Sequence, residues 1–343
     1  MKKLICFIFI LLLIPSVCFS ASSRVLPTSY NEKTYGSNAG KSAEDDDYRD
    51  YTSLATWEAD TDTNLVTATS GEVLTCYADS STYDDVVYIS EATTNASYFR
   101  VLRATSGARG TPTSGVRFES VNLGYTIRGK ESYLGLYDIA AKSVSTTHAA
   151  GIAMFGSHYG RIVGVTAYNC TGSTFGCGIL VQNNTDVVIA NCFVTGCTST
   201  KSLSGGIVLS TSARVSNYYV YNNTVTSGCY GIRVYNSASL SLTVTSKNNI
   251  SQDNTSNISE YGTVTHTQTT NVTSGVTFAA DDYHLASTDT GAIDEGTDLS
   301  SDGTFAFDDD IDGDTRSDWD VGCDEYITAA PATGHGMGMF FSY

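Results

Sequence analysis

The sequence predicts an all-β solenoid, a single-stranded parallel β-helix with a short N-terminal capping helix. The chain of 343 residues holds 31 glycines and 22 tyrosines but only 4 prolines, and it lacks long helical patterns, a balance that suits strands and turns. Four segments begin with Gly-Ile at intervals of 27, 28 and 25 residues, starting at Gly151, Gly178, Gly206 and Gly231. A fixed period of this size is typical of repeat architectures, and it fits one coil of a β-helix better than the longer blade of a propeller.

Stacking of the coils explains the pattern physically. One coil cannot bury its own inner face, whereas coils stacked about 4.8 Å apart close the hydrogen-bond ladder and fill the interior. The glycine of each repeat is expected at a corner, and the longer connection at 198–204 is expected to protrude. The second β run of each repeat ends in an asparagine, and these residues are expected to form a ladder at a turn: Asn169, Asn191, Asn222 and Asn248.

The N-terminal part of the chain divides into three pieces. Residues 1–20 contain two lysines, an unbroken apolar run and small residues at the end, the pattern of a secretory signal peptide, and the apolar run is shorter than the about 20 residues of a membrane span. Residues 21–49 are polar and are expected to form a flexible leader. Residues 50–67 are expected to cap the solenoid with a short helix, for which Thr52 or Ser53 supplies the N-cap.

The net charge and the cysteine content limit which binding partners and which cysteine pairings are expected for the exported chain. Removal of the signal peptide takes away two lysines and changes the formal net charge from −17 to −19, so nucleic acid is not expected as a partner. Seven cysteines remain in the exported chain, and an odd number leaves at least one thiol free or paired between chains. Cys170 and Cys192 each follow a ladder asparagine and are expected on adjacent coils, as a disulfide or as buried thiols.

Three stretches carry a resemblance to a known family. They are the entry DYTSLATWEADTDTNLVT at 50–67, the repeated coils at 151–250, and an ending at 281–326 that contains DYHL, AIDEG, DIDGD and DVGCDEY. Together they resemble secreted bacterial right-handed parallel β-helix proteins of the pectate-lyase-like superfamily, whose closing segments have the form D-Y-x-L … D-x-D-G … D-x-G-x-x-E. Cys323 stands where such segments often have a small residue. The resemblance implies a right-handed β-helix, but the superfamily includes lyases, hydrolases, adhesins and phage spikes, so the fold does not decide the activity.

The outward rows of the regular coils predict a surface for binding rather than for hydrolysis. If the isoleucine after each glycine points inward, strand alternation sends its successor outward, and the rows obtained in this way contain no carboxylate. A glycoside hydrolase needs a pair of carboxylates. The rows instead hold aromatic rings and a base that can contact sugars, although tyrosine also simply suits sheet surfaces. The predicted carbohydrate-binding strip consists of Tyr168, Tyr219, Tyr221, Arg233 and Tyr235.

An acidic stretch near the C-terminus suggests a metal site. Alternate aspartates followed by Gly313 match the start of a calcium loop, in which oxygens converge around a sharp turn. The twelfth position is Trp319 rather than glutamate, which excludes a standard EF-hand and leaves a looser Ca²⁺ site as the one cofactor that the sequence suggests. The predicted ligands are Asp308, Asp310, Asp312 and Asp314. The alternative is a solvated acidic cap over the open end of the solenoid.

These observations lead to one domain and two functional hypotheses. The β-helix domain is expected over 50–326, with the regular coils at 151–250, an acidic closing segment at 281–326 and a flexible tail at 327–343. The leading hypothesis is a secreted or cell-surface protein that binds polysaccharide, or acts as a scaffold or adhesin, through a lateral sheet face, with self-association left open. The alternative is a polysaccharide lyase or glycoside hydrolase whose site lies at 70–150. Its candidate residues are Arg100, Arg103, Arg117, Glu119, Arg128, Lys130, Glu131 and Asp138.

Overall fold

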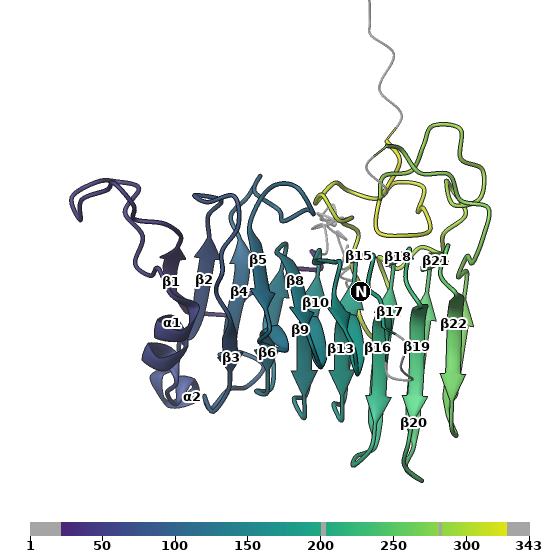
Figure 1. The fold of residues 1–343 in the computed structure, drawn as a ribbon, viewed down its shortest axis with the longest axis horizontal. Helices are drawn as coiled ribbons and strands as arrows, with labels where there is room; N and C mark the ends of the chain where they lie inside the picture. Colours follow the sequence, from purple (N-terminus) through teal and green to yellow (C-terminus); the bar gives the residue numbers. More distant parts are fainter. Residues whose placement is uncertain (1–21, 200–203, 281–282, 328–343) are drawn as a thin grey trace, which may run out of the picture.

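The computed structural model describes residues 22–199, 204–280 and 283–327. Its strands build a parallel solenoid in which successive coils pass through three sheets in a constant order (Figure 1). We number these sheets 1, 2 and 3 in the order in which the chain visits them within a coil. The all-β fold class is therefore confirmed. The predicted signal peptide, the tail beyond residue 327 and most of the loop at 198–204 lie outside the described residues.

The three sheets consist of short strands that pair in parallel with their neighbours. Sheet 1 contains, in spatial order, β1 (Tyr30–Tyr35), β2 (Gly71–Cys76), β4 (Arg100–Ala104), β7 (Gly135–Tyr137), β10 (Arg161–Val163), β14 (Val187–Ala190), β17 (Ser216–Tyr221), β20 (Leu242–Lys247) and β23 (Thr265–Thr269). Sheet 2 contains β12 (Thr171–Gly172), β8 (Ala140–Ser145), β11 (Thr166–Tyr168), β15 (Phe193–Thr195), β18 (Thr224–Thr226) and β21 (Ile250–Gln252), with β5 (Arg117–Val121) also paired to β8. Sheet 3 contains β22 (Ser256–Tyr261), β19 (Tyr230–Asn236), β16 (Gly205–Thr211), β13 (Phe175–Gln182), β9 (His148–Phe155), β6 (Tyr125–Gly129) and β3 (Val87–Ile89).

The isoleucines of the repeat form one interior column, as predicted. Ile152 pairs with Ile179, Ile179 with Ile207, and Ile207 with Ile232, and all four side chains are fully buried. Full burial of such a side chain contributes about 1.5–3 kcal/mol of transfer free energy. This column and its equivalents on the other two sheets make up the core of the solenoid.

The glycines that precede these isoleucines lie within the strands of sheet 3 and not at a corner, which corrects the prediction. A Cβ atom on Gly178 would lie 2.3 Å from Cγ1 of Val194, and one on Gly206 would lie 2.2 Å from Cγ1 of Val225. Both valines belong to sheet 2. Glycine recurs at this position because sheets 2 and 3 approach each other too closely there for any side chain.

Three of the four predicted ladder asparagines share one corner, between sheets 1 and 2. Asn191, Asn222 and Asn248 have left-handed backbone conformations with φ of 51°, 50° and 55°. Asn169 follows sheet 2 instead, so its predicted place in the ladder is wrong. In its coil Gly164, with φ of 65°, occupies the shared corner, because glycine tolerates the left-handed conformation as readily as asparagine does.

A continuous side-chain ladder lies one residue further along, at Asn223, Asn249 and Asn271. Nδ2 of Asn223 donates to Oδ1 of Asn249 at 2.9 Å, and Nδ2 of Asn249 donates to Oδ1 of Asn271 at 2.9 Å. The same two oxygens also accept the backbone N–H groups of Asn223 and Asn249 at 3.0 Å. Stacked identical amides thereby satisfy the polar groups of this buried turn.

The N-terminal end of the solenoid is closed by two short helices, the first of which is the predicted capping helix. Helix α1 (Leu54–Thr61) begins at the N-cap Ser53, whose hydroxyl accepts the backbone N–H of Thr56, and Trp57 on this helix is fully buried. Helix α2 (Leu65–Ala68) follows. Within the described ranges of the chain, no helix is long and apolar enough to cross a membrane.

Part of the expected leader belongs to the solenoid. Strand β1 pairs in register with β2, from Tyr30 opposite Gly71 to Tyr35 opposite Cys76. The prediction of a flexible segment over 21–49 is therefore wrong for these residues. The strand forms because it covers the otherwise unpaired edge of β2.

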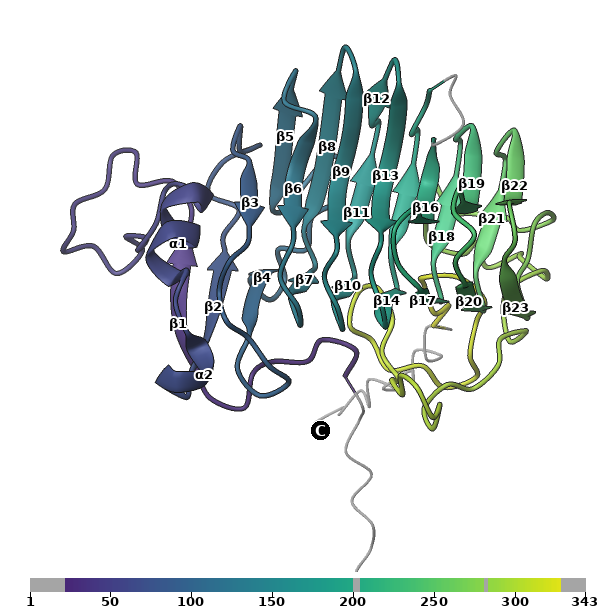
Figure 2. The ribbon, with the colours of Figure 1, turned by 90° about the horizontal axis from the view of Figure 1, so that it is seen from below.

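The C-terminal segment, residues 283–327, runs along the side of the solenoid rather than across its open end (Figure 2). Phe307 and Trp319 belong to the same buried cluster as Tyr221 on the outer face of sheet 1, and Ile311 clusters with Phe193 of sheet 2. Six of the fourteen carboxylates of this segment are buried and accept backbone N–H groups: Asp289, Asp309, Asp310, Asp320, Asp324 and Glu325. The alternative prediction of a solvated acidic cap over the open end is therefore wrong.

Cys170 and Cys192 lie at different corners of the coils, next to Asn169 and Asn191. Cys170 and Cys197 lie at the same corner of adjacent coils, where their thiols donate to the carbonyls of Tyr168 and Thr195 at 3.6 and 3.4 Å. Cys192 lies at the corner between sheets 1 and 2, where its thiol donates to the carbonyl of Ala190 at 3.2 Å. Cys170 and Cys192 are buried free thiols, but the expected stacking of one on the other is wrong because Asn169 and Asn191 occupy different corners. No disulfide joins the cysteines in the part of the chain that the structure describes.

Candidate functional site

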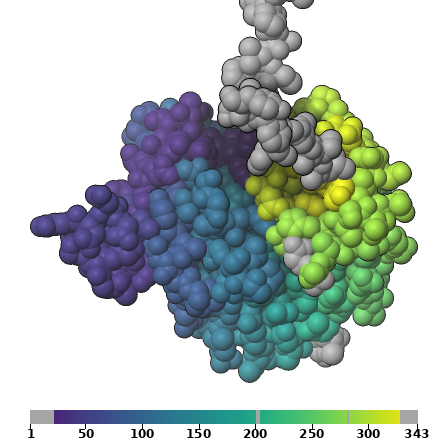
Figure 3. Space-filling view, turned by 90° about the horizontal axis from the view of Figure 1, so that it is seen from above, coloured from purple at the N-terminus to yellow at the C-terminus, as the bar shows by residue number. Residues whose placement is uncertain are grey.

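A groove lies over the N-terminal half of sheet 1, where the terminal segments leave its outer face open. Its volume is about 500 Å³, within the range of ligand-binding pockets. The walls are residues 22–28, which we call the N-terminal strap, the loop at 104–109 and the C-terminal segment at 311–313. Figure 3 shows the side on which the N-terminal residues (purple), the early coils (blue) and the C-terminal segment (yellow) meet. The lining residues are Arg24, Leu26, Glu32, Thr75, Tyr77, Arg103, Ala104, Thr105, Ser106, Gly107, Arg109, Tyr137, Asp138, Ile311, Asp312 and Gly313.

The floor of the groove carries an ion pair built by three successive strands. Glu32 lies on β1, Thr75 on β2 and Arg103 on β4, and strand alternation directs all three outward. Oε1 of Glu32 accepts the hydroxyl of Thr75 at 2.6 Å and Nη2 of Arg103 at 2.8 Å. These two hydrogen bonds lower the pKa of Glu32 below its ordinary value, so this carboxylate is ionised near neutral pH.

A second ion pair fixes the N-terminal strap against the C-terminal segment. Nε of Arg24 donates to both carboxylate oxygens of Asp138 at 2.8 and 2.9 Å, and Nη1 of Arg24 donates to Asp309 at 2.8 Å. The hydroxyl of Tyr137 also donates to the carbonyl of Val25 at 2.8 Å. Burial raises the pKa of Asp138 above its ordinary value, although the guanidinium of Arg24 opposes this effect.

A third ion pair lies where the loop at 104–109 meets the C-terminal segment. Nη2 of Arg109 lies 3.0 Å from Oδ1 of Asp312 and donates to the hydroxyl of Tyr283 at 2.8 Å. The other oxygen of Asp312 lies 2.7 Å from Nε2 of His284. Burial alone would raise the pKa of Asp312, but the hydrogen bond with His284 and the charge of Arg109 bring it below its ordinary value.

The charges of the groove therefore alternate and nearly cancel. Arg24, Arg103 and Arg109 each bind one of the groove carboxylates, which are Glu32, Asp138 and Asp312. Hydroxyl groups and the ring of Tyr77 lie between these ion pairs, and the guanidinium of Arg49 lies 3.6 Å from the centre of that ring. Such a lining offers closely spaced hydrogen-bond donors and acceptors together with an aromatic surface.

The structure does not bring the predicted carbohydrate-binding strip together. Tyr168 lies on sheet 2, Tyr219 and Tyr221 lie on sheet 1, and Arg233 and Tyr235 lie on sheet 3. Tyr168 and Tyr221 are only 3% and 1% exposed. A single strip of these five residues is therefore wrong.

Two separate causes account for this error. The C-terminal segment covers Tyr221. Tyr168 was aligned with the others through Asn169, which occupies a different corner, and its hydroxyl donates to Glu119 at 2.6 Å. Arg233 and Tyr235 do share a face, where Tyr235 stacks on Tyr261 at a centroid distance of 4.7 Å. Binding of a glycan to this pair stays a prediction.

The four aspartates predicted to bind calcium do not converge on one point. Oδ1 of Asp310 accepts the backbone N–H groups of Asp312 and Asp314, and Oδ2 accepts that of Glu325. Asp312 turns away toward Arg109. Alternate spacing in the sequence therefore reflects a tight turn stabilised by Asp310, and the predicted ligand set is corrected accordingly.

The candidate residues at 70–150 separate into structural and groove residues. Arg100 is fully buried and binds Glu131, which is a structural ion pair. Glu119 binds Lys142, and Arg117 donates to backbone carbonyl groups. Arg128 lies against aromatic rings of sheet 3, and Lys130 is exposed. The last two candidates, Arg103 and Asp138, both line the groove.

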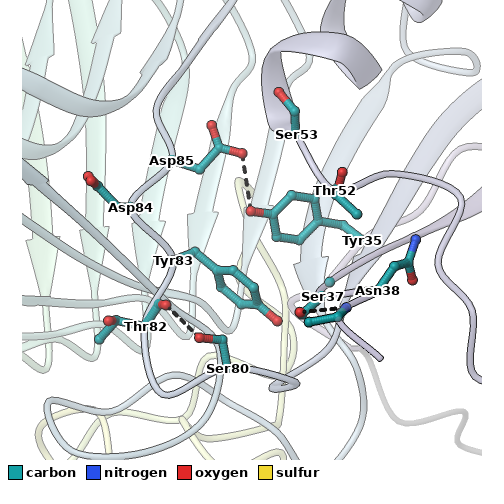
Figure 4. Close-up of a pocket in the computed structure, with 12 residues that line it drawn as sticks. Tyr35, Ser37, Asn38, Thr52, Ser53, Ser80, Thr82, Tyr83, Asp84 and Asp85 are labelled. Atoms are coloured by element: carbon teal, nitrogen blue, oxygen red, sulfur yellow. Dashed lines mark hydrogen bonds between the residues drawn. The ribbon is translucent and has the colours of Figure 1, made fainter. Parts of the chain in front are cut away.

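A second hollow, of about 640 Å³, lies at the N-terminal cap (Figure 4). The hydroxyl of Tyr35 donates to Oδ2 of Asp85 at 3.1 Å, and the same oxygen accepts the backbone N–H of Leu54 at 2.7 Å. The hydroxyl of Tyr83 donates to the carbonyl of Tyr77, and burial raises the pKa of Tyr83 to about 12. These polar groups bind one another and hold helix α1 in place, so we assign the hollow to the cap and the candidate site to the groove.

Sequence reasoning missed Arg24, Glu32, Thr75 and Arg109. Arg24 and Glu32 lie in the expected leader, where the alternation of the short β1 strand could have indicated Glu32 but not Arg24. Arg109 lies in a loop and meets its partner Asp312 across 203 positions of sequence. No local pattern reports such a contact.

A match to one protein family agrees with the topology of the coils. A family described as the right handed beta helix region matches residues 114–251. The chain is a right-handed parallel β-helix. Among solved structures, the chain has weak similarity to a pectin methylesterase from Aspergillus niger, with 11% identity and a TM-score of 0.41 over 84% of this chain and 96% of that one, and to pectate lyase Pel9A, with 12% identity and a TM-score of 0.31 over 84% and 98%. No match is found among curated proteins.

Proposed function

We propose that this β-helix protein binds a polysaccharide in the groove over sheet 1. The observation that carries the proposal is the set of three ion pairs that line the groove: Arg103 with Glu32, Arg24 with Asp138, and Arg109 with Asp312. Sugar hydroxyls both donate and accept hydrogen bonds, and charged partners strengthen such bonds. A lining of alternating guanidinium and carboxylate groups suits a ligand of this kind better than an apolar molecule.

Rigidity of the floor supports the proposal. Thr75 and Arg103 are directly paired across β2 and β4, and Nε of Arg103 donates to Oγ1 of Thr75 at 3.1 Å. Side chains held on strands lose little conformational entropy when a ligand binds. Arg103 and Glu32 also keep 27% and 44% of their side chains exposed, so a ligand can reach both.

The test compares two variants, each of which replaces one positively charged side chain with glutamine. Arg103→Gln removes a hydrogen-bond donor that lines the groove. Lys130→Gln removes an exposed charge that follows β6 and does not line the groove. On a panel of soluble polysaccharides, we expect Arg103→Gln to weaken binding at least about tenfold, as expected for loss of a charged hydrogen bond, and Lys130→Gln to bind like the wild type. Equal affinities of Arg103→Gln and the wild type, at equal melting temperature, would overturn the groove proposal, as would absence of binding across the panel.

A catalytic role is the second candidate. Burial raises the pKa of Asp138 while hydrogen bonds lower that of Glu32, and an acid and a base separated in this way are what sugar hydrolysis requires. Both oxygens of Asp138 are engaged by Arg24, which favours binding over turnover. Reducing-end and unsaturated-product assays on the same panel separate the two functions, since turnover that Asp138→Asn abolishes would replace the binding proposal.

Export is the proposal that follows from the first 20 residues. Its support is the sequence pattern alone. N-terminal sequencing of the protein recovered from the medium or the cell envelope should begin at Ala21. A chain that retains Met1 in the soluble cell fraction would contradict it.

A further inference from the structure

We propose that His284, Asp312 and Asp324 bind a divalent transition-metal ion at the edge of the groove. One ligand atom from each residue, the imidazole nitrogen and two carboxylate oxygens, lies within 4.8 Å of the others. Nε2 of His284 is 2.7 Å from Oδ2 of Asp312 and 3.9 Å from Oδ1 of Asp324. These separations bracket the roughly 3.4 Å expected between neighbouring ligands of a tetrahedral ion with bonds of about 2.1 Å.

The orientation of both carboxylates supports a common ligand. Oδ2 of Asp324 accepts the backbone N–H of Leu285 at 2.7 Å, which turns Oδ1 toward His284. Oδ1 of Asp312 binds Arg109, which turns Oδ2 toward the same imidazole. Each carboxylate thus has one oxygen fixed by the protein and one directed at a shared point, the arrangement by which outer partners orient metal ligands.

The backbone holds the three residues in place before an ion arrives. The N–H of Ile311 donates to the carbonyl of Cys323 at 2.8 Å, so Asp312 and Asp324 follow two paired positions. The N–H of Asp312 donates to Asp310 at 2.9 Å. A preformed site of this kind requires little ordering on binding.

The donor set selects the class of ion. Calcium and magnesium prefer oxygen ligands alone, whereas imidazole together with carboxylates suits zinc, manganese or cobalt. The side chains of His284 and Asp312 are each 33% exposed, so an ion can enter from solvent. Three protein ligands also leave a coordination position for water.

Titration of the full chain with Co²⁺ tests the inference without any glycan, so its outcome is independent of the groove proposal. Visible absorption of bound Co²⁺ distinguishes nitrogen and oxygen ligands from cysteine thiolates, which give intense near-ultraviolet bands. We expect one ion per chain without thiolate bands, displacement by Zn²⁺, and no displacement by an equal concentration of Ca²⁺. In His284→Asn the affinity should fall at least about tenfold.

Two control variants make the titration decisive. His148→Asn removes another imidazole, on sheet 3, and Asp314→Asn removes an exposed carboxylate from the same acidic stretch. Both should bind Co²⁺ like the wild type. Absence of binding up to about 1 mM Co²⁺, by absorption or by a shift in melting temperature, overturns the inference. Thiolate bands, or equal affinity in a folded His284→Asn variant, overturn it as well.

Discussion

The regular coils between β9 and β21 and the two terminal segments are held together in different ways. In the coils, neighbours in space lie one repeat apart in sequence, as in the pairing of Asn223 with Asn249 across 26 positions. In the terminal segments, the contacts occur once and span the chain, as in the hydrogen bond of Arg24 with Asp309 across 285 positions. The coils are stabilised by apolar columns and backbone ladders, whereas the terminal segments combine apolar contacts with buried charged side chains. The regular coils therefore form the scaffold, whereas the terminal segments supply walls of the groove whose floor lies on β1, β2 and β4.

Loss of Arg316 should lower the stability of the protein the most, because its side chain binds several parts of the C-terminal segment at once. This buried guanidinium donates to the carbonyls of Asp309, Gly322 and Cys323 and to Oδ1 of Asn191. Arg316→Met leaves these acceptors unpaired in the interior and should lower the free energy of unfolding by about 3–5 kcal/mol. Urea unfolding measures the change, and the exposed Arg214→Met is the control. A loss below about 1 kcal/mol would show that the segment does not depend on this residue.

A cavity in the regular coils should cost somewhat less. Ile207→Ala removes a fully buried side chain from the middle of the isoleucine column and should lower the free energy of unfolding by about 2–5 kcal/mol. Ile258 pairs with Ile232 at the end of the same column but is only partly buried on the edge strand β22. Ile258→Ala should therefore cost clearly less in the same urea experiment. Equal costs would contradict the idea that burial increases from the edge toward the middle of the stack.

The contribution of the C-terminal segment to stability should depend on pH through Asp320. Burial, together with the charge of Glu325, raises the pKa of Asp320 to about 6. The folded state then holds a proton that the unfolded state has released, so this group contributes stability at low pH that is lost as pH rises from about 4 to 6. The stability of the wild type relative to Asp320→Asn should accordingly fall by about 2 kcal/mol over that interval in the presence of chelator. A difference that is independent of pH would show that Asp320 titrates normally.

Removal of the helix cap should give the smallest effect. Ser53→Ala leaves the N–H of Thr56 without its side-chain acceptor and should lower the free energy of unfolding by about 1 kcal/mol. The exposed Ser81 provides the control substitution to alanine. If Ser53→Ala matched this control, the capping bond would add nothing to the closure of the N-terminal end.

The accuracy of the sequence predictions follows the same division. The isoleucine column and the capping helix were predicted correctly, because period-two alternation and a serine before an apolar face are local signals. Asn169 was assigned to the wrong corner because Gly164 performs the same backbone role without resembling an asparagine. The side-chain ladder at Asn223, Asn249 and Asn271 lies one residue after the predicted ladder. It was not predicted, because its last member follows the repeats that the sequence pattern shows.

The residue pattern was enough to predict that this chain stacks coils with isoleucine inside, since each coil repeats a pattern that only stacking can bury. The tertiary structure alone decided which outer faces stay open. The strap and the C-terminal segment pack on the outer face of sheet 1, and they leave a groove lined by Glu32 and Arg103, while Tyr221 is buried. Contacts of this kind join residues up to 287 positions apart and occur once, so they leave no periodic trace in the sequence.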